Sequence, residues 1–216
     1  MLKSLFIAFL LACGTLQSAE VQIAFLQSEN QATKELLALF ENQYPSTKVK
    51  VLDKSSLDAN KSFVYALDEL VLFSSHKRDY NNGVKLLKEN DIGVIFILNP
   101  NTSAYGVSAI EAMKKEKVYE NVKQKIVYVD AFSLENLKEN EVAIIARSLL
   151  YKQDRTKFKK NIHWMEICSK LYTPINQSMV ILKYDENSSE AKLFYDFVFS
   201  EQAQKILKDF GYTLEE

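Results

Sequence analysis

The chain has 216 residues, of which 47% are hydrophobic and 25% are charged, with 27 basic and 28 acidic side chains. This length suffices for one large or two small globular domains with hydrophobic cores. The near balance of charge excludes a strongly basic nucleic-acid-binding protein and a highly charged disordered chain. With only five glycines, three prolines and two cysteines, collagen-like sequence and a disulfide scaffold are excluded as well.

Residues 1–19 are predicted to be a signal peptide. Lys3 supplies a positive charge, residues 5–12 (LFIAFLLA) are continuously apolar, and small or polar residues follow. Because this apolar run is too short for a permanent membrane span, we expect a soluble mature protein outside the cytoplasm. Cys13 leaves one alternative open, since residues 10–13 (LLAC) resemble a lipoprotein box. We favour ordinary cleavage near Ala19, which would remove Cys13.

The first elements of the mature chain predict a strand–helix–strand unit. Residues 21–26 are rich in strand-forming side chains. Ser28 and Gln31 have the spacing of a capping box, and the amphipathic helix that follows ends before Pro45. A second strand is predicted over residues 48–52. A strand, a helix and a strand within about 30 residues indicate a parallel βαβ unit.

Strands and helices continue to alternate over the rest of the chain, which predicts an α/β fold with parallel or mixed sheets flanked by helices. The remaining predicted strands are, in chain order, residues 63–74, 92–98 (the most apolar, expected to be central), 125–129, 142–146 and 176–183. The remaining predicted helices are residues 84–89, residues 104–115, a short helix capped by Ser133, and two helices that begin near Ser188 and after Ser200, the last ending at Gly211. Residues 152–160 are predicted to form a basic loop.

Serine stands at or near the start of three of the predicted helices, at Ser28, Ser103 and Ser133. A helix N-terminus offers free backbone N–H groups and a partial positive charge, so it can bind an oxyanion without any lysine or arginine. Taken one at a time, these serines are explained more simply as helix caps.

Several motifs, in order along the chain, resemble those of the periplasmic molybdate-binding proteins of ABC transporters. Residues 99–113 (NPNTSAYGVSAIEAM) are similar to the family's "NP…APYG..A…EAL" block, and residues 65–74 (YALDELVLFS) to its "YA.G.LVLWS" strand. Residues 172–177 (YTPINQ) resemble "Y.PI.Q", and residues 194–212 resemble the closing "F..FL.S..A…..YGY". Ser28 falls at the place of the family's "AAS". The resemblance covers nearly all of residues 20–212.

This resemblance implies a two-lobed periplasmic binding fold that crosses between its lobes near Phe63 and again near Tyr172. One lobe would comprise residues 20–63 and 172–216, and the other residues 64–171. A tetrahedral oxyanion such as molybdate or tungstate would bind in the cleft, and a membrane permease would receive it. The resemblance further implies a periplasmic location and a binding protein, not an enzyme, without a cofactor and without nucleic acid. We expect a monomer.

The family's ligand-binding positions are carried over to four residues of this chain. The resemblance implies that hydroxyls come from Ser28 and from Ser56 (or Ser55), and that backbone amides come from Ser28 and from the helix-start residues Tyr105 and Phe132. Ala146 stands where some relatives have a tyrosine. Ser56 lies only seven residues before Phe63, so a section of the first lobe is missing and that lobe is expected to be reduced. Asp53, just before the second serine, would repel an anion.

Other functions find less support in the sequence. His76 and His163 are isolated from each other, which predicts surface residues and neither a catalytic base nor a metal site. Cys168 is predicted to be a small buried residue. Two alternatives stay open beside molybdate transport. The chain could be a relative that has lost its anion site and serves as an accessory protein, or it could bind another anion such as sulfate or an organic acid.

Overall fold

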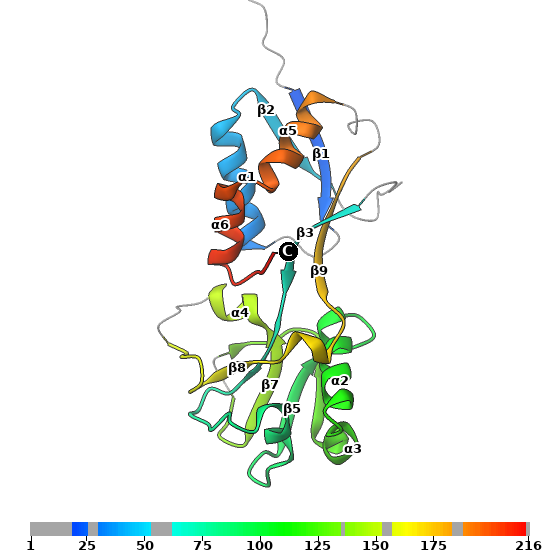
Figure 1. The fold of residues 1–216 in the computed structure, drawn as a ribbon, viewed down its shortest axis with the longest axis vertical. Helices are drawn as coiled ribbons and strands as arrows, with labels where there is room; N and C mark the ends of the chain where they lie inside the picture. Colours follow the sequence, from blue (N-terminus) through cyan, green and yellow to red (C-terminus); the bar gives the residue numbers. More distant parts are fainter. Residues whose placement is uncertain are drawn as a thin grey trace, which may run out of the picture.

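The structure is a computed structural model that describes residues 19–25, 30–52, 62–134, 137–152, 157–182 and 188–214. It contains two mixed β-sheets with flanking helices, which confirms the predicted α/β fold class. Figure 1 shows the two sheets stacked along the long axis of the molecule, with β3 running from the upper half toward the lower half and β9 running beside it in the opposite direction. Residues 1–18 of the predicted signal peptide lie outside the described residues.

Sheet A has the strand order β2-β1-β9-β3 and sheet B the order β6-β5-β7-β4-β8. The strands of sheet A are β1 (Ala19–Phe25), β2 (Thr47–Val51), β3 (Ser62–Asp68) and β9 (Ile175–Ile181). The strands of sheet B are β4 (Leu70–Phe73), β5 (Val94–Leu98), β6 (Ile126–Val129), β7 (Glu141–Ala146) and β8 (Trp164–Glu166).

Helices α1 (Gln31–Gln43), α5 (Ser189–Val198) and α6 (Glu201–Asp209) accompany sheet A, and together they form the sheet A half. The sheet B half is completed by α2 (Ala104–Lys115), α3 (Tyr119–Val122), α4 (Arg147–Lys152) and the 3-10 helices η2 (Gly83–Lys88), η3 (Lys123–Lys125) and η5 (Ser169–Leu171). Across the described residues, each helix is too short or too polar to traverse a lipid bilayer.

The predicted strand–helix–strand unit at the start of the mature chain is confirmed. β1 and β2 pair in parallel, and α1 connects them. The cap of α1 is Asn30 and not the predicted Ser28. The Asn30 side chain accepts the N–H of Thr33 at 3.2 Å, and the Thr33 hydroxyl accepts the N–H of Asn30 at 2.9 Å. Asparagine and threonine three residues apart therefore supply the reciprocal bonds that the serine–glutamine pair was expected to supply.

Aromatic side chains hold the helices of the sheet A half together. Phe40 of α1 is fully buried and contacts the rings of Phe194 and Phe197 of α5 at centroid distances of 5.0 and 5.2 Å in edge-to-face geometry. Such pairs add to the free energy gained by burying the rings. The caps of α5 and α6 are Ser188 and Ser200, as predicted, and each side chain accepts an N–H from the first turn of its helix.

In the sheet B half, β5 pairs in parallel with β6 and with β7. The apolar strand that was expected to be central is therefore an interior strand, while β7 occupies the middle of the sheet. β4 runs antiparallel between β7 and β8. Helix α2 has the bounds that were predicted from sequence, residues 104–115, and it packs on β5.

The prediction of a single strand over residues 63–74 is wrong, because this segment forms two strands in different sheets. β3 ends at Asp68 in sheet A and β4 begins at Leu70 in sheet B. The break falls at Glu69, whose N–H bonds to the Asp68 carboxylate at 2.8 Å and whose carbonyl accepts the N–H of Arg147 at 2.7 Å. These bonds take the Glu69 backbone out of the sheet A ladder.

The chain returns from sheet B to sheet A between β8 and β9, and a hydrogen bond joins this return segment to the crossing between β3 and β4. Tyr172, on the returning segment, is buried and accepts the N–H of Leu70 through its hydroxyl at 3.0 Å. β3 and β9 pair in antiparallel fashion as far as Asp68 and Ile175, so they approach sheet B side by side.

Three further expectations need correction or lie outside the described residues. Helix α4 begins before the predicted basic loop at 152–160, and β8 follows that loop; sequence analysis predicted neither element. Cys168 is exposed, not buried. For the predicted helix capped by Ser133, residues 135 and 136 lie outside the described residues.

Gly106 provides a test of how α2 is seated on sheet B. A Cβ atom at Gly106 would lie 2.1 Å from the Leu98 carbonyl oxygen, whereas a Cβ atom at Gly83 would meet nothing within 4 Å. We expect Gly106→Ala to lower the free energy of unfolding by about 1–3 kcal/mol, because α2 must shift away from β5. Urea denaturation measures this change.

Gly83→Ala is the matched control, since its cost comes only from the positive φ of 56° and amounts to about 1 kcal/mol. A Gly106→Ala protein that is as stable as the wild type would contradict the close approach of α2 to β5.

Candidate binding cleft between the two sheets

A pocket of about 330 Å³ lies where the two halves meet. The sheet A half contributes Asn30, Gln31, Ala32, Gln177, Phe210 and Tyr212 to its lining. The sheet B half contributes Leu98, Tyr105, Asp130, Ala131, Phe132, Ile145, Ala146, Ser148 and Leu149. Because both halves supply walls, a change in the angle between them would open or close the pocket.

Two long helices begin at this pocket, one from each half. Gln31 and Ala32 belong to the first turn of α1, and Tyr105 belongs to the first turn of α2. The residues after the end of β6, including Phe132, form a further part of the wall. In α/β proteins, ligands bind beyond the carboxyl ends of strands, where helix N-termini direct free N–H groups and a partial positive charge toward them.

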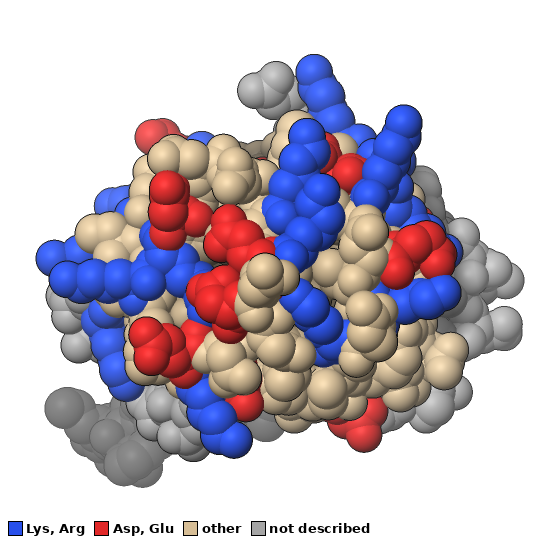
Figure 2. Space-filling model, turned by 90° about the horizontal axis from the view of Figure 1, so that it is seen from below, with Lys and Arg blue, Asp and Glu red and all other residues tan. Residues whose placement is uncertain are grey.

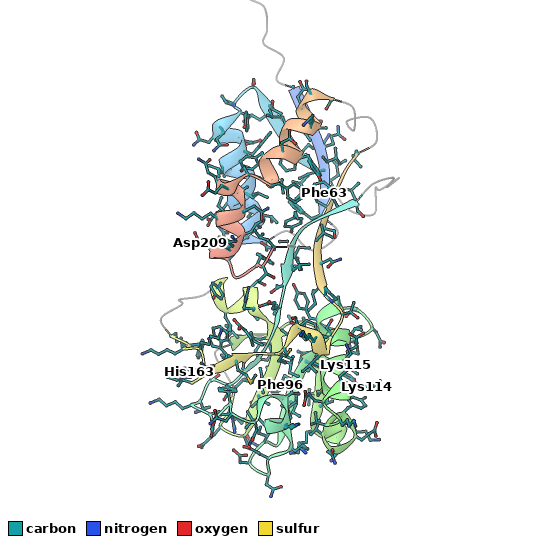
Figure 3. All side chains as sticks on the ribbon, in the orientation of Figure 1. Phe63, Phe96, Lys114, Lys115, His163 and Asp209 are labelled. Carbon is teal, nitrogen blue, oxygen red and sulfur yellow. The ribbon has the colours of Figure 1, made fainter. Side chains whose placement is uncertain are left out.

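The lining of the pocket contains no lysine or arginine among the described residues, and its one carboxylate is Asp130. The basic side chains of α2, Lys114 and Lys115, are in its last turn, at the opposite end from Tyr105 (Figure 3). At the outer end of the sheet B half, basic and acidic side chains are interspersed and do not separate into patches of one sign (Figure 2). The described lining therefore offers an anion only neutral donors.

Beneath the pocket lies a buried carboxylate, Asp68, which is 2% exposed. Its Oδ1 accepts the N–H groups of Glu69 at 2.8 Å and Ser148 at 3.2 Å. Its Oδ2 accepts the hydroxyl of Tyr105 at 2.8 Å and also the hydroxyl of Ser148. Burial raises the pKa of Asp68, and these four hydrogen bonds oppose that shift because they favour the charged form.

The tyrosines of the pocket remain neutral near pH 7. Burial raises the pKa of Tyr105 well above its usual range, and the neighbouring Asp68 carboxylate raises it further. Burial and the same carboxylate raise the pKa of Tyr212 to about 12. The Tyr105 hydroxyl accepts from Gln177 Nε2 at 3.2 Å, and the Tyr212 hydroxyl accepts from Asn30 Nδ2 at 3.0 Å. Hydroxyls and carboxamides thus form a neutral polar network along the pocket.

Arg147, the first residue of α4, connects the two halves beside the pocket. Its Nε donates to the carbonyl of Gly211 at 2.7 Å, and its guanidinium forms ion pairs with Glu69 and, at 3.4 Å, with Glu166. Gly211 has a φ of 84°, and its Cα faces the ring of Tyr151, where a Cβ atom would come within 2.7 Å. Glycine at this turn allows α4 to pack against the C-terminal segment.

The structure brings together two of the four predicted site residues. Tyr105 and Phe132 both line the pocket, from the start of α2 and from the segment after β6. Ser28 and Ser56, with its alternative Ser55, lie outside the described residues. The ligand-binding roles assigned to these residues therefore stay predictions.

Four other polar residues of this region were not predicted from the sequence, namely Asp68, Ser148, Gln177 and Tyr212. Asp68 carried a usable signal, because it stands where the "YA.G.LVLWS" pattern has glycine. Gln177 and Tyr212 end two of the quoted motifs, but their proximity to Tyr105 depends on long-range pairing. Ser148 carried no signal, since it belongs to the helix α4 that was not predicted.

The described residues contain no group of three or more histidine, cysteine, aspartate or glutamate side chains arranged to hold a metal ion. His163 lies on the sheet B half, and Figure 3 places it away from α1 and α6. Burial and the nearby Lys77 and Lys159 lower its pKa, so it is neutral near pH 7.

Comparison with known proteins identifies the family. A family model described as bacterial extracellular solute-binding protein matches residues 45–213, and the chain belongs to that family. The molybdate-binding protein ModA of Azotobacter vinelandii is 26% identical over 243 aligned residues, which cover 96% of this chain and 95% of that protein. ModA of Rhodobacter capsulatus is 28% identical over 170 residues, or 77% of this chain and 65% of that protein.

The fold agrees with this assignment. The solved structure of the Azotobacter vinelandii periplasmic molybdate-binding protein superposes with a TM-score of 0.66 at 19% identity, covering 86% of this chain and 95% of that one. The resemblance inferred from the motifs is thereby confirmed, and so is the periplasmic-binding-protein fold. The family to which the chain belongs is described as one of solute-binding proteins, not of enzymes.

The bond between Tyr105 and Asp68 can be tested through stability. Tyr105→Phe keeps the ring and the backbone amide but removes one of the four donors to a buried carboxylate. We expect it to lower the free energy of unfolding by about 1–3 kcal/mol, the cost of leaving a buried charged acceptor short of a partner. Urea denaturation near pH 7 measures the loss.

The control is Tyr195→Phe on α5, because that side chain is 42% exposed. There we expect a change within about 0.5 kcal/mol. Equal stability of the two variants would contradict a supporting role for the Tyr105 hydroxyl.

Proposed function

We propose that this protein is a periplasmic solute-binding protein that binds a tetrahedral oxyanion of the molybdate or tungstate type and delivers it to the membrane permease of an ABC transporter. The observation that carries this proposal is the convergence of the first turns of α1 and α2 on one pocket whose described lining has no cationic side chain. The relatives named as molybdate-binding proteins support the same ligand class.

The chemistry of such a pocket suits a small anion. Hydrogen bonds from N–H groups to an anion are short and roughly twice as strong as those between neutral partners. Helix N-termini add a partial positive charge without the rigid geometry of a guanidinium. Ser28 and Ser56 would add hydroxyl donors, and the backbone amides of Tyr105 and Phe132 would complete the ligand shell.

The two-lobed organisation explains how the ligand would be captured and released. We assign sheet A with its helices to one lobe and sheet B with its helices to the other. The lobes are joined at Glu69, at the segment around Tyr172 and at the contact of Arg147 with Gly211. Closure of the lobes about these connections would surround the anion, and the permease would recognise the closed form.

A thermal-shift panel tests this function. Molybdate, tungstate, sulfate and phosphate are each added to the mature protein, with the chloride salt as the blank. A ligand at about 100 times its Kd stabilises the folded state by about 2.7 kcal/mol. For a chain of this size, we therefore expect molybdate and tungstate to raise Tm by about 5–10 °C.

Ser28→Ala is expected to abolish the shift, since it removes a predicted hydroxyl donor. Ser46→Ala, at an exposed turn between α1 and β2, is the matched control and should retain the shift. A panel in which no oxyanion raises Tm would contradict the proposed function. A shift with sulfate or phosphate alone would contradict the molybdate assignment and identify that anion as the ligand.

A further inference from the structure

The proposed ligand shell makes no use of Asp68, although this residue occupies a central position. Asp68 is the last residue of β3, and β4 of the other sheet begins two residues later. It contacts Tyr105 and Ser148, which line the pocket, but it is 2% exposed and does not line the pocket itself. A carboxylate is thus buried behind the wall of a cleft proposed to hold an anion.

The geometry around Asp68 is that of a fully bonded acceptor. Two backbone N–H groups and two hydroxyls converge on its two oxygens, from Glu69, Tyr105 and Ser148. Removing a buried charge from water is expensive, and only a complete set of donors makes it tolerable. These four donors also offset the negative charge that a ligand in the pocket would experience.

The donors connect different parts of the fold. Tyr105 lies in the first turn of α2 and Ser148 in the first turn of α4, both in the sheet B half, whereas Asp68 belongs to β3 of sheet A. The carboxylate therefore ties two walls of the pocket to the strand on which the halves cross. Groups held in place before a ligand arrives bind it more tightly, because less conformational entropy is lost on binding.

A carboxylate in this place has two effects of opposite sign. Through space it repels an anion, so removing its charge would tighten binding. As a support it fixes the pocket walls, so removing it would weaken binding. The four directed donors and the absence of Asp68 from the pocket surface favour the second effect.

We propose that Asp68 is the positioning residue of the cleft: by accepting the Tyr105 and Ser148 hydroxyls it fixes the starts of α2 and α4 in their ligand-binding places. This inference rests on the proposed oxyanion function, which it deepens. It predicts that loss of the carboxylate weakens oxyanion binding despite the loss of a negative charge.

The test compares Asp68→Asn with the wild type in two measurements. Isothermal titration calorimetry with sodium molybdate gives Kd, and hydrogen–deuterium exchange of the ligand-free protein reports on residues 104–108 and 147–150. We expect Kd to rise roughly 10- to 100-fold, as when a bonded support of a binding residue is lost. We also expect faster exchange in both segments.

Asp196→Asn is the matched control. Asp196 is exposed on α5 and pairs with Lys192, so this substitution makes the same change in charge far from the crossing. It should leave Kd and the exchange of both segments unchanged. Adding Tyr105→Phe to Asp68→Asn should change Kd little further, because the Tyr105 hydroxyl acts through Asp68; fully additive effects would indicate a merely structural role and overturn the proposal.

Tighter or unchanged molybdate binding by Asp68→Asn would overturn the proposal, and so would unchanged exchange in residues 104–108 and 147–150. If the wild type binds no oxyanion, the proposed function fails, and the exchange comparison alone still decides the positioning role. If Asp68→Asn does not fold, Ser148→Ala is measured in the same way. A smaller change in the same direction supports the proposal, and no change overturns it.

Discussion

Four hydrogen bonds converge on the buried Asp68 carboxylate and connect three segments of the fold. The carboxylate lies where the chain passes from sheet A to sheet B, and its donors come from α2, from α4 and from the crossing itself. A buried charge is tolerated only with such a set of partners, so the relative positions of these three segments are constrained together. The pocket lies directly against two of them.

This constraint connects the fold to the proposed function. Two helices begin at the pocket and supply N–H groups, while the neutral tyrosines and carboxamides supply further polar contacts. An anion bound without a cationic side chain depends on the directions of dipoles, which are effective only when they are held in place. The hydrogen bond from Arg147 to Gly211 links the two halves at a second point, in addition to the crossing between β3 and β4.

Much of the fold could be predicted from the sequence, because helix and strand periodicity is a local property. The bounds of α2 and the serine caps of α5 and α6 follow from residues that are near neighbours in the chain. One error falls where a distant residue, Arg147, decides the outcome. Residues 63–74 look like one strand, but the bonds of Glu69 to Asp68 and Arg147 divide it. A second error is local: Asn30, not Ser28, caps α1, because Thr33, three residues further on, provides the returning bond.

Three features could be predicted from the amino-acid sequence: the alternation of strands and helices, the family resemblance and the positions of Tyr105 and Phe132 after the ends of strands. They could be predicted because each depends on short spacings or on motifs in a fixed order. The folded chain was needed to show that one pocket is lined by Tyr105, Ser148, Gln177 and Tyr212 and that Asp68 lies behind them. Strand pairing and the crossing between sheets bring those residues together over separations of dozens of positions, and side-chain periodicity carries no information about contacts at that range.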